Sequence, residues 1–341
     1  MSTVRTAPSL PGDQASRLRS LVESMRVRVD SAPGLVEPQP RVAPPRRTPV
    51  VCVTSGKGGV GKTNLCVNLS IALARKGLRS TLLDADLGMA NADVLCGLSP
   101  TRRLERVVGL VGPSAERADA PRTRLADIAV DAPGGFRLVP GAVGIARMAD
   151  LNAHERELIL DALSDLDASS DVLVVDTGAG ASPGVTTFAR AADLTIVVVT
   201  PEPTSIADAY ALIKCLLLGP GADDRTGESL RLSMVVNQAV DADEARAVHA
   251  RIAAVAQRFL RFPIDLLGWV PSDPAIPLAV RARRPLLLSP GKSAAGNAVE
   301  SIGSAVIERL GIRSACVTTK RHTSWLGRVS AMLRAEPVRV R

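Results

Sequence analysis

Residues 50–73 read VVCVTSGKGGVGKTNLCVNLSIAL, and this stretch decides the fold. An apolar strand pattern leads into a glycine-rich loop, and an apolar helix pattern follows it. Residues 56–63 match G-x-x-x-x-G-K-T, a loop whose backbone N–H groups surround a β-phosphate at a helix N-terminus. Lys62 is predicted to bridge the β- and γ-phosphates of a nucleotide, and the Thr63 hydroxyl to ligate Mg²⁺. Because a strand and a helix flank the loop in the required order, this interpretation is favoured over a glycine-rich strand–helix turn.

The loop holds a second lysine, Lys57, which needs its own explanation. The chain has six lysines against 36 arginines, and two of the six lie in this loop. One lysine is sufficient for the bound nucleotide, so Lys57 is predicted to reach a phosphate held by another subunit. A solvated surface lysine is the alternative.

Two predicted strands end in carboxylates: Asp84 and Asp86 end one of them, and Asp176 ends another. In an open parallel sheet, ligands lie beyond the carboxyl ends of the strands, so these residues are expected to face the loop. Asp176 is predicted to hold Mg²⁺ through water, and Asp84 to support that water shell. Asp86 is predicted to orient the attacking water, and the amide of Gly178 to sense a γ-phosphate. An ordinary turn at a strand end is the alternative for either strand end alone.

The rest of the central chain alternates apolar strands with helical patterns. Strands are predicted at 50–54, 80–84, 136–139, 171–176, 194–199, 231–236 and 264–270, and helices at 63–76, 154–167, 204–218, 242–260 and 292–310. Runs such as VLVV (172–175) are apolar on both faces, as in a sheet that is covered on both sides. The pattern predicts an α/β protein with a P-loop NTPase fold: a mostly parallel, twisted sheet with helices on both faces.

The net charge of +8 lies at the two ends of the chain. Residues 1–49 carry eight arginines and four acidic residues, and residues 313–341 carry seven basic residues and one glutamate, which leaves −2 for residues 50–312. The charge therefore does not indicate a DNA-binding body, and no specific DNA binding is expected. The five cysteines form no C-x-x-C pair, which favours reduced thiols in a cytoplasmic protein.

Four segments are predicted: an N-terminal helix region (1–30), a proline-rich linker (31–48), the central domain (49–312) and a basic tail (313–341). Within the tail, five apolar residues recur on one face of a basic amphipathic helix: Trp325, Leu326, Val329, Met332 and Leu333. This pattern is typical of a helix that binds an anionic membrane surface. A helix packed on the body of the protein is the alternative.

KGGVGKT (57–63), with its extra lysine, resembles the deviant Walker A motif of the MinD/ParA family of P-loop ATPases. Other segments resemble the flagellar FlhG/FleN branch of that family more than division-site MinD or plasmid ParA: DQASRLR (13–19), DADLGMANADVLCGL (84–98), TPEPTSIADAYALIK (200–214), VVNQA (235–239), GWVPSDPAI (268–276) and RARRPLLLSPGKSAAG (281–296). The resemblance extends from Asp13 to about Leu310. The proline-rich linker and a polar insert near 112–122 depart from the pattern.

The resemblance implies a slow, dimerisation-dependent ATPase that uses ATP and Mg²⁺. In the implied homodimer, Lys57 contacts the nucleotide of the partner, and Glu202 and Asp208 lie near the dimer face. The implied phosphate contacts are Gly56, Lys57, Gly58, Gly59, Val60, Gly61, Lys62, Thr63 and Asn64. Adenine recognition is implied for Asn237 and for the segment from Pro271 to Asp273.

The same resemblance implies a regulator of flagellar number or placement. The motif from Asp13 to Arg19 would engage an FlhF-like GTPase of the signal-recognition type, and flagellar basal-body components or a flagellar transcription regulator would be further partners. The protein would be cytoplasmic and, when ATP-bound, peripheral on the inner face of the cell membrane. The alternatives are a ParA-type partitioning or division-site positioning ATPase, and a scaffold in which ATP only supports the fold.

Overall fold

The computed structural model describes residues 48–86, 90–100, 128–141, 169–219, 230–312 and 328–329. The predicted N-terminal helix, the linker, the helix at 154–167 and most of the tail lie outside these ranges. Among the helices that the ranges contain, none has the length and apolarity that a bilayer crossing requires.

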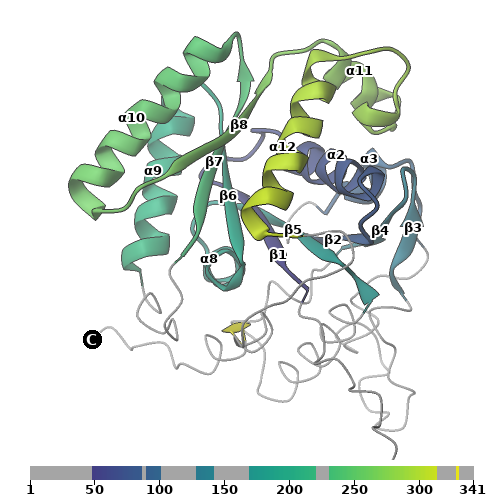
Figure 1. Cartoon of the computed structure of the whole chain (residues 1–341), viewed down its shortest axis with the longest axis horizontal. Coiled ribbons are helices and arrows are strands. Elements are labelled where there is room, and N and C mark those ends of the chain that lie inside the picture. Colours follow the sequence, from purple (N-terminus) through teal and green to yellow (C-terminus); the bar gives the residue numbers. More distant parts are fainter. Residues whose placement is uncertain are drawn as a thin grey trace, which may run out of the picture. The chain divides into compact units, whose positions relative to one another are not determined.

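Within the described residues, eight strands form one sheet in the order β3-β4-β2-β5-β1-β6-β7-β8 (Figure 1). The strands are β1 (Val50–Ser55), β2 (Ser80–Ala85), β3 (Val130–Ala132), β4 (Phe136–Val139), β5 (Val172–Ala179), β6 (Leu194–Val199), β7 (Leu232–Ala239) and β8 (Asp265–Pro271). Every pair is parallel except the edge pair of β3 with β4. All seven predicted strands are confirmed, and only β3 was not predicted.

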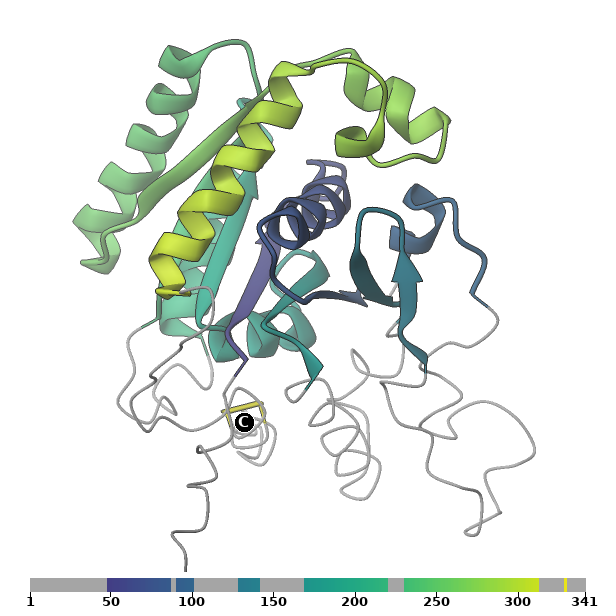
Figure 2. The same cartoon turned by 45° about the vertical axis from the view of Figure 1, so that its right-hand side comes forward.

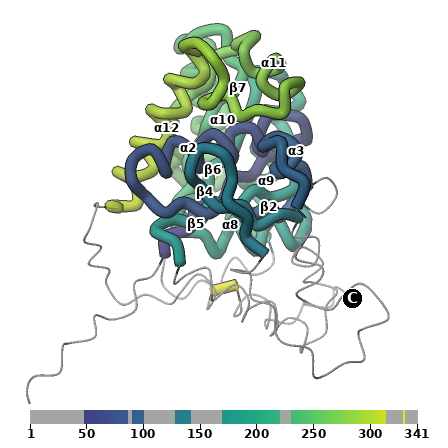
Figure 3. Tube along the Cα trace, turned by 90° about the vertical axis from the view of Figure 1, so that its right-hand side faces the viewer, coloured from purple at the N-terminus to yellow at the C-terminus, as the bar shows by residue number. Residues whose placement is uncertain are grey.

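The described helices are α2 (Lys62–Arg75), α3 (Ala92–Leu95), α8 (Pro183–Ala191), α9 (Pro203–Leu218), α10 (Ala242–Leu260), α11 (Ala275–Arg281) and α12 (Ala294–Leu310), with a 3₁₀ turn η1 (Leu286–Leu288). Helices α8, α9 and α10 cover one face of the sheet, and α2 and α12 cover the other (Figures 1 and 2). A quarter-turn of the view shows α2 and α12 next to each other (Figure 3). The predicted α/β fold with helices on both faces is confirmed.

Strand β1 shows why the sheet needs both layers. Val50 and Cys52 belong to the core beneath α8, α9 and α10, whereas Val51 and Val53 belong to the core beneath α2 and α12. All four side chains are fully buried. Because successive side chains of a strand point to opposite faces, a strand that is apolar throughout is stable only when both faces are covered.

Two residues of the C-terminal tail lie on the body. Val329 is fully buried in the core beneath α8, α9 and α10. The Nε of Arg328 donates to the carbonyl oxygen of Ala191 at 2.7 Å, and its Nη2 lies 2.9 Å from Oδ1 of Asp193. In this structure apolar burial and a shielded ion pair hold Val329 on the body, as in the alternative of a helix packed on the protein. The other four residues of that predicted face lie outside the described ranges.

Candidate nucleotide-binding site

The glycine-rich loop joins the end of β1 to the start of α2. Gly59 and Gly61 have φ values of 80° and 89°, a backbone conformation that side chains with a Cβ rarely adopt. Gly61 is the N-cap of α2, and no side chain caps this helix. The first N–H groups of α2 therefore remain available to an anion, to which the positive end of the helix dipole adds.

Two close approaches explain why glycine stands at positions 56 and 61. A Cβ on Gly56 would lie 2.1 Å from the backbone carbon of Asp208 in α9, and one on Gly61 would lie 2.4 Å from the side-chain nitrogen of Asn237. That nitrogen donates to the carbonyl oxygen of Val60 at 2.8 Å. The loop is therefore held between α9 on one side and the end of β7 on the other.

The two loop lysines lie in different surroundings. Lys62, the first residue of α2, is buried. Lys57 is half-exposed, and its ammonium lies 2.6 Å from Oε2 of Glu202 and 3.0 Å from the hydroxyl of Thr204. The structure thus gives Lys57 a partner within its own chain, at the N-terminus of α9.

The acidic strand ends lie side by side, as the sequence predicted. Asp84 in β2 is the register partner of Asp176 in β5, and both are buried. Burial raises the pKa of Asp176 to about 6, while the Thr63 hydroxyl and the Lys62 ammonium act against this rise. Burial, and next the charge of Asp176, raise the pKa of Asp84 to about 7. The Thr63 hydroxyl lies close to Asp176 but outside hydrogen-bonding geometry, and neither carboxylate oxygen of Asp176 has a hydrogen-bond partner in the described part of the chain.

An orphaned buried carboxylate next to a hydroxyl fits a cation, because a buried charge needs a counter-charge. Carboxylate, hydroxyl and water oxygens are the ligands of Mg²⁺, so Asp176 and Thr63 fit this ion. In the ranges that the structure describes, no group of three or more His, Cys, Asp or Glu residues forms a metal cage. The arrangement suits Mg²⁺ that keeps water and phosphate ligands.

Asp86 and Gly178 also come together. A Cβ on Gly178 would lie 3.5 Å from Oδ1 of Asp86. The backbone N–H of Asp86 donates to Oδ1 of Asp84 at 3.3 Å, and the N–H of Ala92 donates to its Oδ2 at 3.1 Å. The carboxylate of Asp84 is therefore tied to the turn that carries Asp86.

A cavity of about 640 Å³ adjoins the loop. Its wall comes from the first turn of α2, the ends of β7 and β8, and residues of α11, η1 and α12. The volume falls in the usual range for small-molecule sites, and the lining is mostly apolar. The hydrogen bond from Nδ2 of Asn237 to Val60 leaves the carbonyl oxygen of that side chain as an acceptor, which fits the amino group of adenine.

Of the segment predicted to recognise adenine together with Asn237, Ser272 and Asp273 lie in the cavity wall, and Pro271 is not part of it. Both carboxylate oxygens of Asp273 are already engaged: Oδ1 accepts from the N–H of Ala275 at 2.8 Å, and Oδ2 accepts from the Ser293 hydroxyl at 2.7 Å and the N–H of Ala295 at 3.1 Å. Asp273 connects α11 to α12 and so shapes the wall. Its negative charge accepts hydrogen bonds at the N-termini of both helices and interacts favourably with their dipoles.

The cavity wall also contains residues that were not predicted as site residues, among them Arg281, Leu286 and Val299. Arg281 and Leu286 belong to RARRPLLLS (281–289), a segment that the resemblance had singled out without a role. Val299 carries no local signal, since it is one apolar residue of a helix whose buried face is apolar throughout.

Residues 51–286 match the family described as the CobQ/CobB/MinD/ParA nucleotide binding domain. The chain belongs to this family. It is 40% identical over 257 residues to the antiactivator FleN of Pseudomonas aeruginosa, covering 75% of this chain and 85% of that protein. It is 28% identical over 287 residues to the flagellum site-determining protein YlxH of Helicobacter pylori, covering 83% of this chain and 90% of that one.

Among solved structures, the septum site-determining protein MinD of Pyrococcus horikoshii, complexed with Mg-ADP, has the same fold. The TM-score is 0.58 at 20% identity, over 79% of this chain and all of that one. The resemblance to MinD/ParA ATPases, and to their FleN branch, is confirmed by the family match and the relatives. As a member of this family, the chain has a nucleotide-binding domain in which the loop, the paired carboxylates and the cavity lie together.

Proposed function

We propose that this member of the MinD/ParA family is an ATPase switch that closes into a homodimer on Mg-ATP and reopens after hydrolysis. The observation that carries the proposal is the fully buried carboxylate of Asp176 beside Thr63, which has no hydrogen-bond partner and lies in β5, the strand paired with β1. Bound Mg²⁺ would supply positive charge to Asp176 in addition to that of the Lys62 ammonium. The N–H groups from Gly56 to Asn64 would hold the phosphates, with Lys62 bridging the β- and γ-phosphates.

Hydrolysis would depend on Asp86 and Gly178. Asp86 orients the attacking water, and Gly178 senses the γ-phosphate through its amide. The adjacency of these two residues supports this assignment. Asp84 supports the water shell of the metal, because its charge lies next to that of Asp176.

Dimerisation would depend on Lys57 leaving Glu202 for the nucleotide of the partner subunit. The exposed ion pair with Glu202 is weak enough to be exchanged, since pairs of this kind contribute at most about 1 kcal/mol. A phosphate is a stronger attraction for a lysine because it carries more charge.

We propose regulation of flagellar number or placement as the biological role, because FleN is an antiactivator and YlxH determines the flagellar site. In this proposal the segment 1–30 binds an FlhF-like GTPase through the motif from Asp13 to Arg19, and residues 31–48 are its linker. Basal-body components or a flagellar transcription regulator bind the ATPase domain (49–312). The protein is cytoplasmic until ATP brings it to the inner face of the membrane.

Membrane attachment would use the tail (313–341), and it requires that the tail first leave the body. Val329 belongs to the apolar face that would enter the headgroup region, and it is fully buried here. A dimer presents two such helices at once, and linked sites gain roughly 10²–10⁴ in avidity. The proposed attachment is therefore conditional on ATP.

Three lysine variants test the switch. Mg-ATP affinity is measured by calorimetry, and mass in solution by light scattering. Lys62→Ala is expected to lose ATP binding, whereas Lys57→Ala binds ATP and stays monomeric. Lys76→Ala removes an exposed lysine next to α2 and outside the loop, so it is the matched control and behaves as the wild type. A wild-type protein that binds no Mg-ATP or stays monomeric at saturation contradicts the proposal, as does a Lys57→Ala protein that dimerises normally.

The flagellar role is tested in the native host. Deletion of the gene is expected to change the number or position of flagella per cell, as counted by electron microscopy. The wild-type gene restores the pattern, and Lys62→Ala does not. Unchanged flagella together with impaired inheritance of DNA would instead favour a partitioning ATPase.

A further inference from the structure

A buried asparagine connects the phosphate-loop helix to the wall of the cavity. Asn68 lies one turn after Asn64 in α2, and it is only 1% exposed. Its Oδ1 accepts from the backbone N–H of Leu287 at 2.9 Å. Its Nδ2 donates to the backbone oxygen of Asn64 at 2.8 Å and to the side-chain Oδ1 of Asn64 at 3.0 Å. Every polar group of the Asn68 side chain is thus engaged in the space between α2 and η1.

This arrangement fixes the orientation of a second amide. A backbone N–H can only donate, so Leu287 requires the oxygen of Asn68, and Nδ2 of Asn68 must point the other way. That nitrogen can only donate, so Asn64 must turn its own oxygen towards Asn68. The donor of Asn64, its Nδ2, is therefore left for the cavity. No acceptor for it is found in the part of the chain that the structure describes, and Asn64 is part of the cavity wall.

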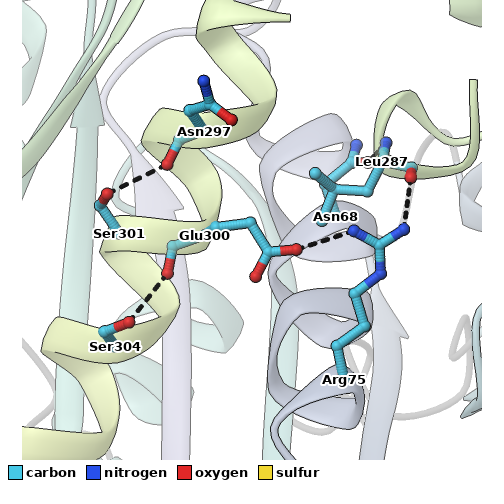
Figure 4. A network of polar contacts seen from close by, with 7 residues as sticks. All are labelled: Asn68, Arg75, Leu287, Asn297, Glu300, Ser301 and Ser304. Atoms are coloured by element: carbon cyan, nitrogen blue, oxygen red, sulfur yellow. Dashed lines mark hydrogen bonds and ion pairs between the residues drawn. The ribbon is translucent and has the colours of Figure 1, made fainter. Parts of the chain in front are cut away.

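Leu287, whose N–H binds Asn68, is held by a second side chain of α2. Nη2 of Arg75 donates to the carbonyl oxygen of Leu287 at 2.6 Å, and Nη1 lies 2.8 Å from Glu300 of α12 (Figure 4). Both backbone groups of Leu287 are thus bound by side chains of α2. The preceding residue, Leu286, lines the cavity. The position of this wall is therefore set by the same helix that starts at the phosphate loop.

We propose that Asn68 is a positioning residue for the nucleotide. It makes Asn64 a hydrogen-bond donor towards an oxygen of the bound nucleotide, on the α-phosphate or the ribose, and it aligns the η1 wall with the loop. The inference rests on the proposed function, because it takes the ligand of the cavity to be a nucleotide. It adds a residue that touches no ligand and acts through Asn64.

Asn68→Asp tests the orientation. The carboxylate still accepts from Leu287, but it offers no donor to Asn64, so Asn64 must turn its Nδ2 inwards and present an oxygen to the nucleotide. The dissociation constant of ADP, measured by calorimetry, is expected to rise at least about tenfold, the scale of one hydrogen bond to a charged group. Asn297→Asp places the same charge on the exposed face of α12 and is expected to leave affinity unchanged.

A double-mutant cycle with Asn64 separates this role from loss of fold. Asn64 is half-exposed, so its variants are expected to fold. Asn64→Ala is expected to lose affinity, and Asn64→Ser to keep it, because a hydroxyl accepts from Asn68 and donates to the ligand at once. In the Asn64→Ala background, Asn68→Asp is expected to have no further effect on ADP affinity.

A purely structural role for Asn68 predicts equal losses in both backgrounds, and that result overturns the proposal. Unchanged affinity of Asn68→Asp in the wild-type background also overturns it. Adenosine, which has no phosphate, locates the oxygen that accepts from Asn64. If Asn68→Asp loses affinity for ADP but not for adenosine, this oxygen lies on the α-phosphate. If the variant loses affinity for both ligands, the oxygen lies on the ribose. If the wild-type protein binds no nucleotide, the proposed function itself is wrong. Calorimetry on the wild type detects this outcome separately from any effect of the variants.

Discussion

The ammonium of Lys57 lies 2.6 Å from a carboxylate oxygen of Glu202 in the same chain. Their side chains are 38% and 58% exposed, so water screens the pair and its contribution is small. The lysine that distinguishes this loop from other phosphate loops is thus occupied at the N-terminus of α9. Any contact of Lys57 with a second subunit has to replace Glu202.

Glu202→Gln is expected to favour the ATP-dependent dimer. Removal of the competing charge frees Lys57 and strengthens dimerisation by up to about fivefold, the equivalent of 1 kcal/mol. Sedimentation velocity at several protein concentrations measures the change. Asp265→Asn, which breaks the exposed Arg309–Asp265 pair at the edge strand β8, is the control and leaves dimerisation unchanged. Weaker dimerisation of Glu202→Gln would show that the glutamate supports the interface.

Gly56→Ala is expected to destabilise the nucleotide-free protein. The new Cβ meets the backbone of α9 at Asp208, where nothing flexible can move aside. Overpacking of this kind costs about 1–3 kcal/mol, which lowers Tm by about 2–4 °C per kcal/mol in a domain of this size.

Gly58→Ala is the matched control in the same loop, since a Cβ at Gly58 meets no atom within 4 Å. Its Tm in calorimetry should equal that of the wild type. Equal decreases in Tm for Gly56→Ala and Gly58→Ala would contradict the close packing of the loop on α9.

Asp273→Asn is expected to show a pH-dependent loss of stability. The Ser293 hydroxyl, followed by the backbone N–H groups of Ala275 and Ala295, holds the pKa of Asp273 below its ordinary value of 3.8. The native state therefore binds fewer protons than the unfolded state as the pH falls through this range. The stabilisation is complete above pH 3.8 and is lost as the pH falls through the lowered pKa.

Thermal unfolding at pH 7 should show Asp273→Asn to be less stable by about 1 kcal/mol, the scale of a helix N-terminal contact. This difference should shrink below pH 4. Asp243→Asn removes an exposed carboxylate paired with Arg246 within α10, and at either pH it should change stability by less than about 0.5 kcal/mol. A deficit of Asp273→Asn that is constant with pH would contradict the assigned role of the charge.

Arg328→Ala is expected to release the tail. The variant loses the shielded pair with Asp193 and the bond to the carbonyl of Ala191, so Val329 leaves the core more readily. The fraction that sediments with anionic liposomes in the absence of ATP should rise. Arg309→Ala removes an exposed arginine and is the control for charge. Equal sedimentation of Arg328→Ala and the wild type would indicate that docking of the tail does not limit membrane binding.

Some elements escaped sequence analysis for physical reasons. Helices α8 and α11 have nine and seven residues, too few for a clear period, and a proline interrupts the pattern of α11. Their stability comes from buried contacts, such as those of Val185 and Phe188 in α8, which belong to a core that other elements build. Strand β3 has three residues and pairs only with β4, so no alternation marks it.

The sequence by itself determined the phosphate loop, seven of the eight described strands and four of the described helices in their order along the chain, and the carboxylates of β2 and β5. These features are local, since spacing, apolar runs and glycine positions act over a few residues. Only the tertiary structure decided the cavity wall, the hydrogen bond from Ser293 to Asp273, and the chain of hydrogen bonds that joins Leu287, Asn68 and Asn64. Asn68 and Leu287 are 219 residues apart, and their hydrogen bond exists only because α2 and η1 are packed together. Which of its polar groups an asparagine offers to a ligand depends on such distant partners, and no local pattern encodes them.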